Sequence, residues 1–241
     1  MMDDIKKKEI LNAAKNWFKD VFIPIHIKNI KKLSNPSQFK INPFLVKYLA
    51  QLLNTQADSI AIAKALIYPR VLGTSVNTSF GNHVQKFISD TFNAPGSETE
   101  GVDIKFIDKM DGKEKFCQIK LGPNTLNKDD IKTIHGHFQA LRNRSKTNNK
   151  SIPSEDLVVG VLYGEEKELS GQYKKLRNEY HYSVYVGRNF WLRLTGSSNF
   201  YDELIVAINQ AVLESDGLNE FQNAITKLSN STIVRELADI D

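Results

Sequence analysis

The chain has 241 residues, of which 41% are hydrophobic and 25% charged, and this length and composition can bury the core of one larger domain. Its single cysteine, Cys117, excludes an internal disulfide and a zinc site built from several cysteines. No apolar run approaches the length of a membrane span, and the first residues lack the apolar stretch of a secretory signal, so we expect a cytoplasmic protein that does not contact a membrane. The formal net charge of +4 favours a polyanionic partner only weakly.

The first 92 residues are predicted to be mainly helical. Apolar side chains recur every three or four positions over residues 9–22, 42–53, 57–66 and 80–92, which is the pattern of amphipathic helices. Pro24 is expected to end the first of these helices and Pro69 the third. The residues that follow, Asn-Ala-Pro-Gly at 93–96, predict a break in the chain.

The rest of the chain, residues 93–241, predicts a sheet followed by closing helices. Residues 102–106 alternate between apolar and polar, Asp111-Gly112 signals a hairpin, and residues 115–121 form the return strand. A helix is predicted over 127–141, strands over 157–163 and 182–186, and helices over 202–213 and 218–237. We therefore expect a single α/β domain over 1–241, with a mixed sheet flanked by helices.

Three polar residues on the predicted hairpin could act together. Side chains on a strand alternate between its faces, so Gln118 and Lys120 lie on the face opposite Cys117 and Ile119. Pairing through the hairpin would bring Asp103 to the same edge of the sheet. Such a group could hydrolyse a phosphodiester, leaving 3′-hydroxyl and 5′-phosphate ends. Asp103, the Gln118 side-chain oxygen and the Ile119 carbonyl would hold Mg²⁺, while Lys120 would orient or help to deprotonate the attacking water.

The same segments resemble a known nuclease family. Gly101-Val102-Asp103-Ile104, followed by Phe116-Cys117-Gln118-Ile119-Lys120, is similar to the PD-(D/E)XK core found in many bacterial type II restriction enzymes. Residues 41–44, 68–74, 158–164 and 184–191 further resemble a restriction-enzyme group whose known member cuts a degenerate GGNCC-containing palindrome. The resemblance implies a restriction-endonuclease-like fold, Mg²⁺ as cofactor, and a homodimer that cuts double-stranded DNA.

The chain departs from this family at two acidic positions. Gln118 stands where the core motif carries Glu or Asp, so metal binding should be weaker unless another carboxylate compensates. Glu100 and Glu98 are the nearest candidates. The acidic residue that many members carry on an early helix is also absent, since residues 81–85 offer only neutral polar groups.

Phosphate contacts are expected from basic clusters at 142–150 and 174–188 and from the turn that precedes the helix at 127. Base-reading residues are expected first within 128–150 and second within 177–188. Each candidate residue could instead have a purely structural role, because turns, helix caps and solvated basic segments carry the same residue types. The candidates are Asn124, Thr125, Asn127, His135, Arg142, Arg144, Lys174 and Arg177. Phe190 and Trp191 are expected in the core rather than stacked on DNA.

Three functions are compatible with these observations. The first is a type II endonuclease that cuts a short palindromic site. The second is a restriction enzyme that requires 5-methylcytosine in its target. The third is a non-catalytic DNA-binding protein on the same fold, which the neutral Gln118 would suit. A nucleotide cofactor is not expected, because the chain has no Gly-rich loop of the GxxxxGK[ST] kind.

Overall fold

The computed structural model describes residues 3–92, 100–147 and 149–240. The chain forms two compact units: a sheet unit of Met1–Lys15 and His83–Ile208, and a helical unit of Asn16–Asn82 and Asn209–Asp241. The sequence predicted a mainly helical part that ends near residue 92. In the structure each unit instead combines two separate segments of the chain. Among the residues described, no helix is both long enough and apolar enough to cross a membrane.

The sheet unit contains a mixed four-stranded sheet, as predicted. The strands follow the order β1-β2-β3-β4, with β1 antiparallel to β2 and the other two pairs parallel. Their bounds are β1 Ile104–Ile107, β2 Glu114–Lys120, β3 Leu157–Val161 and β4 Ser183–Val186. All four lie within or close to the predicted ranges. Helix α6 (Lys128–Thr147) connects β2 to β3, and α7 (Gly171–Tyr180) connects β3 to β4.

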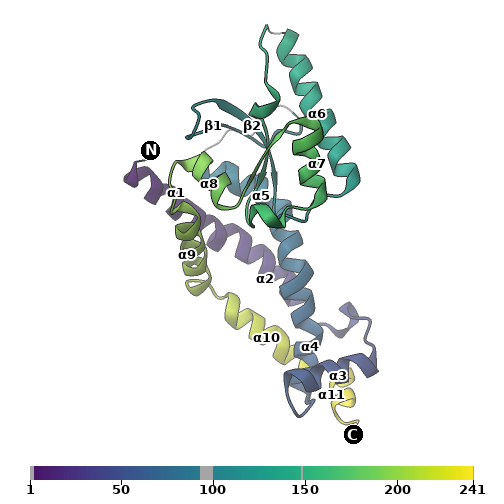
Figure 1. The fold of residues 1–241 in the computed structure, drawn as a ribbon. Helices are drawn as coiled ribbons and strands as arrows, with labels where there is room; N and C mark the ends of the chain where they lie inside the picture. Colours follow the sequence, from purple (N-terminus) through teal and green to yellow (C-terminus); the bar gives the residue numbers. More distant parts are fainter. Residues whose placement is uncertain (1–2, 93–99, 148, 241) are drawn as a thin grey trace. The chain divides into compact units, whose positions relative to one another are not determined.

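Apolar side chains bury both faces of this sheet. On one face, Val159 and Val161 of β3 join Val184 of β4 in a core with apolar residues of α6 and α7, which lie along this side (Figure 1). On the other face, Phe190 of α8 (Arg188–Thr195) packs so close to Gly160 that a Cβ there would lie 2.5 Å from its ring. Phe190 and Trp191 are buried, which confirms that they belong to the core.

Helices α7 and α8 were missed in the sequence. The basic residues of α7 suggested a solvated segment, although Tyr173 and Leu176 on the same helix are fully buried. Gly187 precedes α8 with a φ of +51°, and a Cβ on it would lie 2.2 Å from the Gly164 carbonyl oxygen. The turn from β4 into α8 therefore requires glycine, and it lets a helix follow the strand directly.

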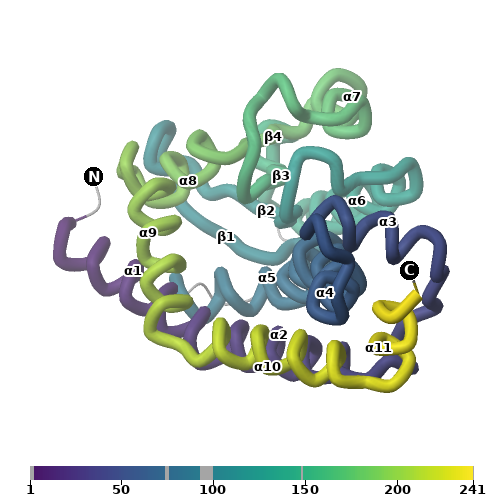
Figure 2. The backbone as a smooth tube through the Cα atoms, turned by 90° about the horizontal axis from the view of Figure 1, so that it is seen from below, coloured from purple at the N-terminus to yellow at the C-terminus, as the bar shows by residue number. Residues whose placement is uncertain are grey.

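The helical unit has its own core. Apolar residues of five α-helices build it: α2 (Ile23–Lys32), α3 (Pro43–Leu53), α4 (Ser59–Tyr68), α10 (Gly217–Ser229) and α11 (Thr232–Ala238). Helices α2 and α10 run side by side (Figure 2). The other helical segments of the chain are α1 Asp4–Trp17, η1 Phe18–Phe22, η2 Pro36–Gln38, η3 Pro69–Ser75, α5 Val76–Phe92, η4 Ser154–Asp156, η5 Glu166–Glu168 and α9 Phe200–Leu213.

Several predicted helix ends are wrong. Pro24 and Pro69 do not stop the chain's helical path, because each stands in the first turn of a helical segment, where the missing N–H costs little. The predicted helix over 218–237 is divided into α10 and α11. The expected start of α3 is confirmed, since the Asn42 side chain accepts hydrogen bonds from Phe44 N at 3.1 Å and Leu45 N at 3.3 Å. The break predicted at 93–96 lies outside the described residues.

A buried ion-pair network secures the hairpin. Lys115 of β2 is 1% exposed, and its Nζ lies 2.6 Å from Asp156 Oδ1 and 2.8 Å from Asp111 Oδ2. Burial acts to lower the pKa of Lys115, but the two carboxylates outweigh it and the pKa is raised. The two ion pairs of Lys115 therefore stabilise the fold fully at pH values below the pKa that Lys115 has in the unfolded chain. This stabilisation is lost as the pH rises through the raised pKa of Lys115 in the folded protein.

Replacing Lys115 by methionine is expected to lower the free energy of unfolding by about 3 kcal/mol, because it leaves Asp156 buried without its cation. Urea denaturation at neutral pH measures the change. Lys113→Met is the control, since Lys113 lies exposed in the same hairpin. Equal stability of the two variants would contradict the network's role.

Candidate active site

Asp103 lies at the open end of the hairpin, one residue before β1. Its backbone N–H donates to Cys117 O at 2.8 Å, just beyond Ile104 and Cys117, the last paired residues of β1 and β2. Its side-chain Oδ2 accepts from the Ile119 N–H at 2.6 Å. Asp103 is therefore bonded to β2 through both its backbone and its side chain, at the two residues that flank Gln118.

Gln118 and Lys120 are on β2 with the predicted alternation. Both are half-buried, whereas Cys117 and Ile119 between them are buried on the other face. Burial strongly raises the pKa of the Cys117 thiol, which fits the packing role expected for it. Lys120 Nζ lies 3.7 Å from Asp130 Oδ1, in the first turn of α6. The hairpin thus brings the three predicted residues to one edge of the sheet.

Gln118 supplies an oxygen that lacks a protein partner. Its Oε1 is buried and accepts no hydrogen bond from the described residues. Because the N–H and C=O of one strand residue point to the same side, the Ile119 carbonyl faces the edge where its N–H meets Asp103. A carboxylate, an amide oxygen and a peptide carbonyl are the ligands that Mg²⁺ prefers. The donor set therefore fits a hard cation, although the described residues contain no cluster of three or more His, Cys, Asp or Glu.

Gln85 joins this group from a distant part of the sequence. On α5, its Nε2 donates to Asp103 Oδ1 at 2.5 Å, so both oxygens of the carboxylate are engaged. The sequence showed only that residues 81–85 are neutral and polar. No local signal marks Gln85, because its contact depends on how α5 packs in the sheet unit.

The environment of Asp103 opposes its negative charge. Burial raises the pKa of the Asp103 carboxyl above its ordinary value, and the Ile119 N–H, the Lys120 ammonium and the Gln85 amide offset this only in part. A carboxylate in such surroundings gains more from a bound cation than one in water. The raised pKa of Asp103 and the set of oxygen ligands thus both favour a bound cation at this position.

His137 of α6 packs against Gly101, two residues before Asp103. Gly101 has a φ of +77°, and a Cβ on it would lie 2.2 Å from the His137 ring. His137 Nδ1 is buried without a hydrogen-bond partner among the described residues, and its Nε2 lies 3.9 Å from Glu100 Oε1. The Glu100 side chain is 90% exposed, and its described contact is with His137 rather than with Asp103. Glu98 lies outside the described residues.

The candidate DNA contacts near the start of α6 have structural roles. The Asn127 side chain accepts from Asp129 N and Asp130 N, at 2.8 and 2.9 Å, and so caps the helix. Thr125 Oγ1 donates to Gly122 O at 2.9 Å, and Asn124 is exposed in the same turn. Of these three side chains, Asn124 is the freest to reach a ligand.

The remaining candidates lie on α6 and α7. The His135 ring packs at a tilt against Tyr180, with ring centroids 4.3 Å apart, and its Nδ1 lies 2.8 Å from Tyr182 Oη. Arg177 is engaged within the unit, since its guanidinium pairs with Glu166 and donates to Val184 O. The others are Arg142, which is half-buried and donates to Ser154 Oγ at 3.4 Å, and the exposed Arg144 and Lys174.

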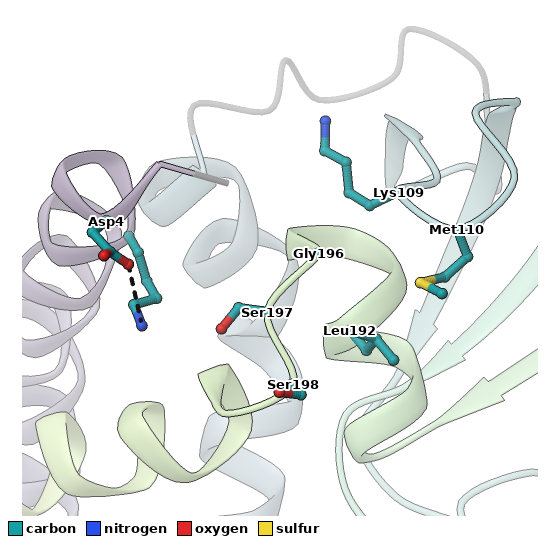
Figure 3. Close-up of a pocket in the computed structure, with 8 residues that line it drawn as sticks. Asp4, Lys109, Met110, Leu192, Gly196, Ser197 and Ser198 are labelled. Atoms are coloured by element: carbon teal, nitrogen blue, oxygen red, sulfur yellow. Dashed lines mark ion pairs between the residues drawn. The ribbon is translucent and has the colours of Figure 1, made fainter. Parts of the chain in front are cut away.

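A separate hollow of about 560 Å³ lies elsewhere in the sheet unit (Figure 3). It is lined by residues of α1, the hairpin turn, α8 and the segment after α8, and the Asp4–Lys7 ion pair of 3.8 Å stands at its side. None of Asp103, Gln118 or Lys120 lines it. The hollow is therefore distinct from the candidate active site.

Comparison with known sequence families supplies an independent finding. The family of the Type II restriction endonuclease EcoO109I matches residues 12–216 of the chain. The matched region contains the hairpin, the residues grouped around Asp103, and most of both units. Comparison with individual curated proteins gave no significant match.

Proposed function

Because the chain belongs to the family of the type II restriction endonuclease EcoO109I, we propose that it hydrolyses double-stranded DNA at a short palindromic site with Mg²⁺ as cofactor. Membership of the family makes the protein a nuclease and DNA its substrate. The observation that carries the proposal is the convergence of Asp103, Gln118 and Lys120 at one end of the hairpin. Because these three residues converge on the hairpin, we also assign the sheet to the PD-(D/E)XK core.

Each residue of the group has a proposed role. Asp103, the Gln118 Oε1 and the Ile119 carbonyl hold the cation, which when bound supplies positive charge that stabilises the transition state of phosphodiester hydrolysis. Gln85 donates to Asp103 Oδ1, so this amide would have to give up its hydrogen bond for that oxygen to hold a cation. Neutral amides at both 85 and 118 leave one carboxylate in the proposed ligand set, which predicts weak cation affinity in the absence of DNA.

Lys120 acts on the attacking water. Its ammonium offsets the negative charge that develops on the phosphate and orients a water molecule in line with the leaving group. The water oxygen forms a bond to phosphorus while the bond to the 3′ oxygen breaks. The attacking water releases one proton to solvent and the 3′ oxygen takes up one, so the products are 3′-hydroxyl and 5′-phosphate ends.

The target sequence is proposed from resemblance. Residues 41–44, 68–74, 158–164 and 184–191 are similar to an enzyme group whose known member cuts a GGNCC-containing palindrome. We propose a related palindrome for this chain, cut by two copies that each act on one strand.

Plasmid cleavage tests the proposal. The purified protein is incubated with unmethylated and with cytosine-methylated plasmid carrying GGNCC sites, in Mg²⁺ or EDTA. Discrete fragments in Mg²⁺ alone are expected, with the unmethylated plasmid cut. Cleavage of the methylated plasmid alone would replace the proposal with a methylation-dependent enzyme. Intact DNA in every lane, with a salt-sensitive mobility shift, would reject the catalytic assignment.

Restoring a carboxylate at position 118 is expected to strengthen cation binding. Gln118→Glu adds a negative charge at the buried oxygen that lacks a partner, and we expect the affinity for Ca²⁺ to rise about tenfold, or about 1.4 kcal/mol. Isothermal titration calorimetry without DNA measures the change. Gln139→Glu is the control, because Gln139 is half-buried on α6 outside the proposed ligand set. Equal affinities of wild type and Gln118→Glu would exclude position 118 from the site.

A further inference from the structure

Asp130, in the first turn of α6, is an acidic residue that the fold brings to Lys120. Its Oδ1 lies 3.7 Å from Lys120 Nζ, and the side chains of Asp130 and Lys120 are 29% and 21% exposed. Burial raises the pKa of Asp103, and the Lys120 ammonium counteracts that rise. The same cation is therefore within electrostatic reach of Asp103 and of Asp130.

Hydrogen bonds hold the turn that joins Lys120 to α6. The Leu162 N–H donates to Lys120 O at 3.1 Å, directly after the last paired residues of β2 and β3. The Gly122 carbonyl accepts from Tyr173 Oη and from Thr125 Oγ1, each at 2.9 Å. Because Tyr173 is fully buried on α7, these bonds tie the turn to the core of the sheet unit. The start of α6 is thus fixed relative to Lys120.

A reciprocal cap fixes the Asp130 side chain. The Asn127 side chain accepts from the Asp130 N–H at 2.9 Å, and Asp130 Oδ2 accepts from the Asn127 N–H at 2.8 Å. This is the arrangement of a capping box, in which the third residue of a helix bonds back to the cap residue. One carboxylate oxygen therefore serves the start of the helix, while the other, Oδ1, faces Lys120.

Neither helix capping nor DNA binding accounts for the negative charge of Asp130. The cap uses Oδ2 alone, and a neutral amide oxygen serves in a capping box as well as a carboxylate does. A carboxylate close to a phosphate opposes DNA binding, because the two negative charges repel each other. The contact with Lys120 does depend on the charge, since an ammonium is attracted to a carboxylate.

We propose that Asp130 is a positioning residue, which holds the Lys120 ammonium ready to face the reacting phosphate. This role rests on the proposed function, because it requires that Lys120 takes part in cleavage. Lysine has a long flexible stem, and ordering it costs conformational entropy. With Asp130 in place this ordering precedes DNA binding, so the reactive geometry is reached more often.

Single-turnover cleavage of plasmid in Mg²⁺ tests the proposal, and mobility shift in Ca²⁺ measures DNA affinity. Asp130→Asn removes the charge but keeps an oxygen that can accept from the Asn127 N–H. We expect the cleavage rate to fall about tenfold, while DNA affinity stays equal or rises. A general effect of removing negative charge near DNA would strengthen binding without slowing cleavage.

Asp129→Asn is the matched control. Asp129 lies in the same first turn of α6, is 91% exposed, and pairs with Lys132 at 3.9 Å rather than with Lys120. Its substitution removes the same charge from the same end of the helix, and the cleavage rate should equal that of wild type. Thermal melting checks that both variants stay folded.

A second background shows whether Asp130 acts through Lys120. Lys120→Met lacks the ammonium, so adding Asp130→Asn to it should lower the rate no further. A purely structural role at the start of α6 would lower the rate by the same factor in both backgrounds. Asp130→Glu keeps the charge and supplies the usual capping-box residue, and it should cut DNA faster than Asp130→Asn.

The outcomes separate this role from the proposed nuclease function. Slow cleavage by a folded Asp130→Asn beside normal cleavage by Asp129→Asn, with no further loss in the Lys120→Met background, supports the role. A wild-type rate in Asp130→Asn, or an equal loss in both backgrounds, overturns the role and leaves the nuclease function in place. Intact DNA with the wild-type protein overturns the nuclease function, and the role of Asp130 with it.

Discussion

Asp103→Asn is expected to reduce Mg²⁺-dependent DNA cleavage by on the order of 10³-fold while leaving the fold at least as stable as wild type. The loss follows because the variant removes the single carboxylate of the proposed ligand set. The stability follows from the raised pKa of the Asp103 carboxyl, which means that the fold favours the neutral form. The metal-free wild type should thus gain stability as pH falls through that pKa, and asparagine supplies a neutral side chain at every pH.

Two measurements on the same samples check this result. Cleavage of plasmid under single-turnover conditions gives the rate, and thermal melting in EDTA at pH 7 gives the stability. The asparagine carbonyl can still accept from the Ile119 N–H, and the Gln85 amide can turn so that its oxygen accepts from the asparagine NH2 group. Asp239→Asn, at an exposed site after α11, is the control and should change neither value. Retained cleavage in Asp103→Asn would remove Asp103 from the active site.

Lys120→Met is expected to lower the cleavage rate by on the order of 10³-fold with little loss of DNA binding. The variant keeps the length of the side chain but removes the charge that faces the reacting phosphate. DNA affinity depends on many phosphate contacts, so one lysine contributes little to it. Single-turnover cleavage in Mg²⁺ and mobility shift in Ca²⁺ measure the two quantities separately.

Lys128→Met is the matched control for this variant. Lys128 begins α6, is exposed, and stands close in sequence to Asp130, the residue that Lys120 contacts. Normal cleavage by Lys128→Met beside a defective Lys120→Met would locate the effect in the active site. Equal losses in both would show that general charge near the DNA explains the result instead.

Local patterns in the sequence were enough to predict the sheet. Alternation along 115–121 gave the face on which Gln118 and Lys120 lie, and the continuous apolar run at 157–163 gave a strand buried on both faces. Helix ends were less well predicted. Pro24 was expected to end a helix, yet proline also suits the first turn of the next helical segment, and the sequence alone does not distinguish the two positions.

The strand periodicity of two and the hairpin signal determined that Asp103, Gln118 and Lys120 could meet, because both act over a few neighbouring residues. Contacts between distant segments were decided by tertiary structure. Gln85 reaches Asp103 from 18 positions away, and Lys120 meets Asp130 across the strand-to-helix turn. The exposure of Phe44, Leu45 and Leu52 on α3 was likewise undecided, since an apolar helix has the same sequence whether its second face is buried or open to solvent.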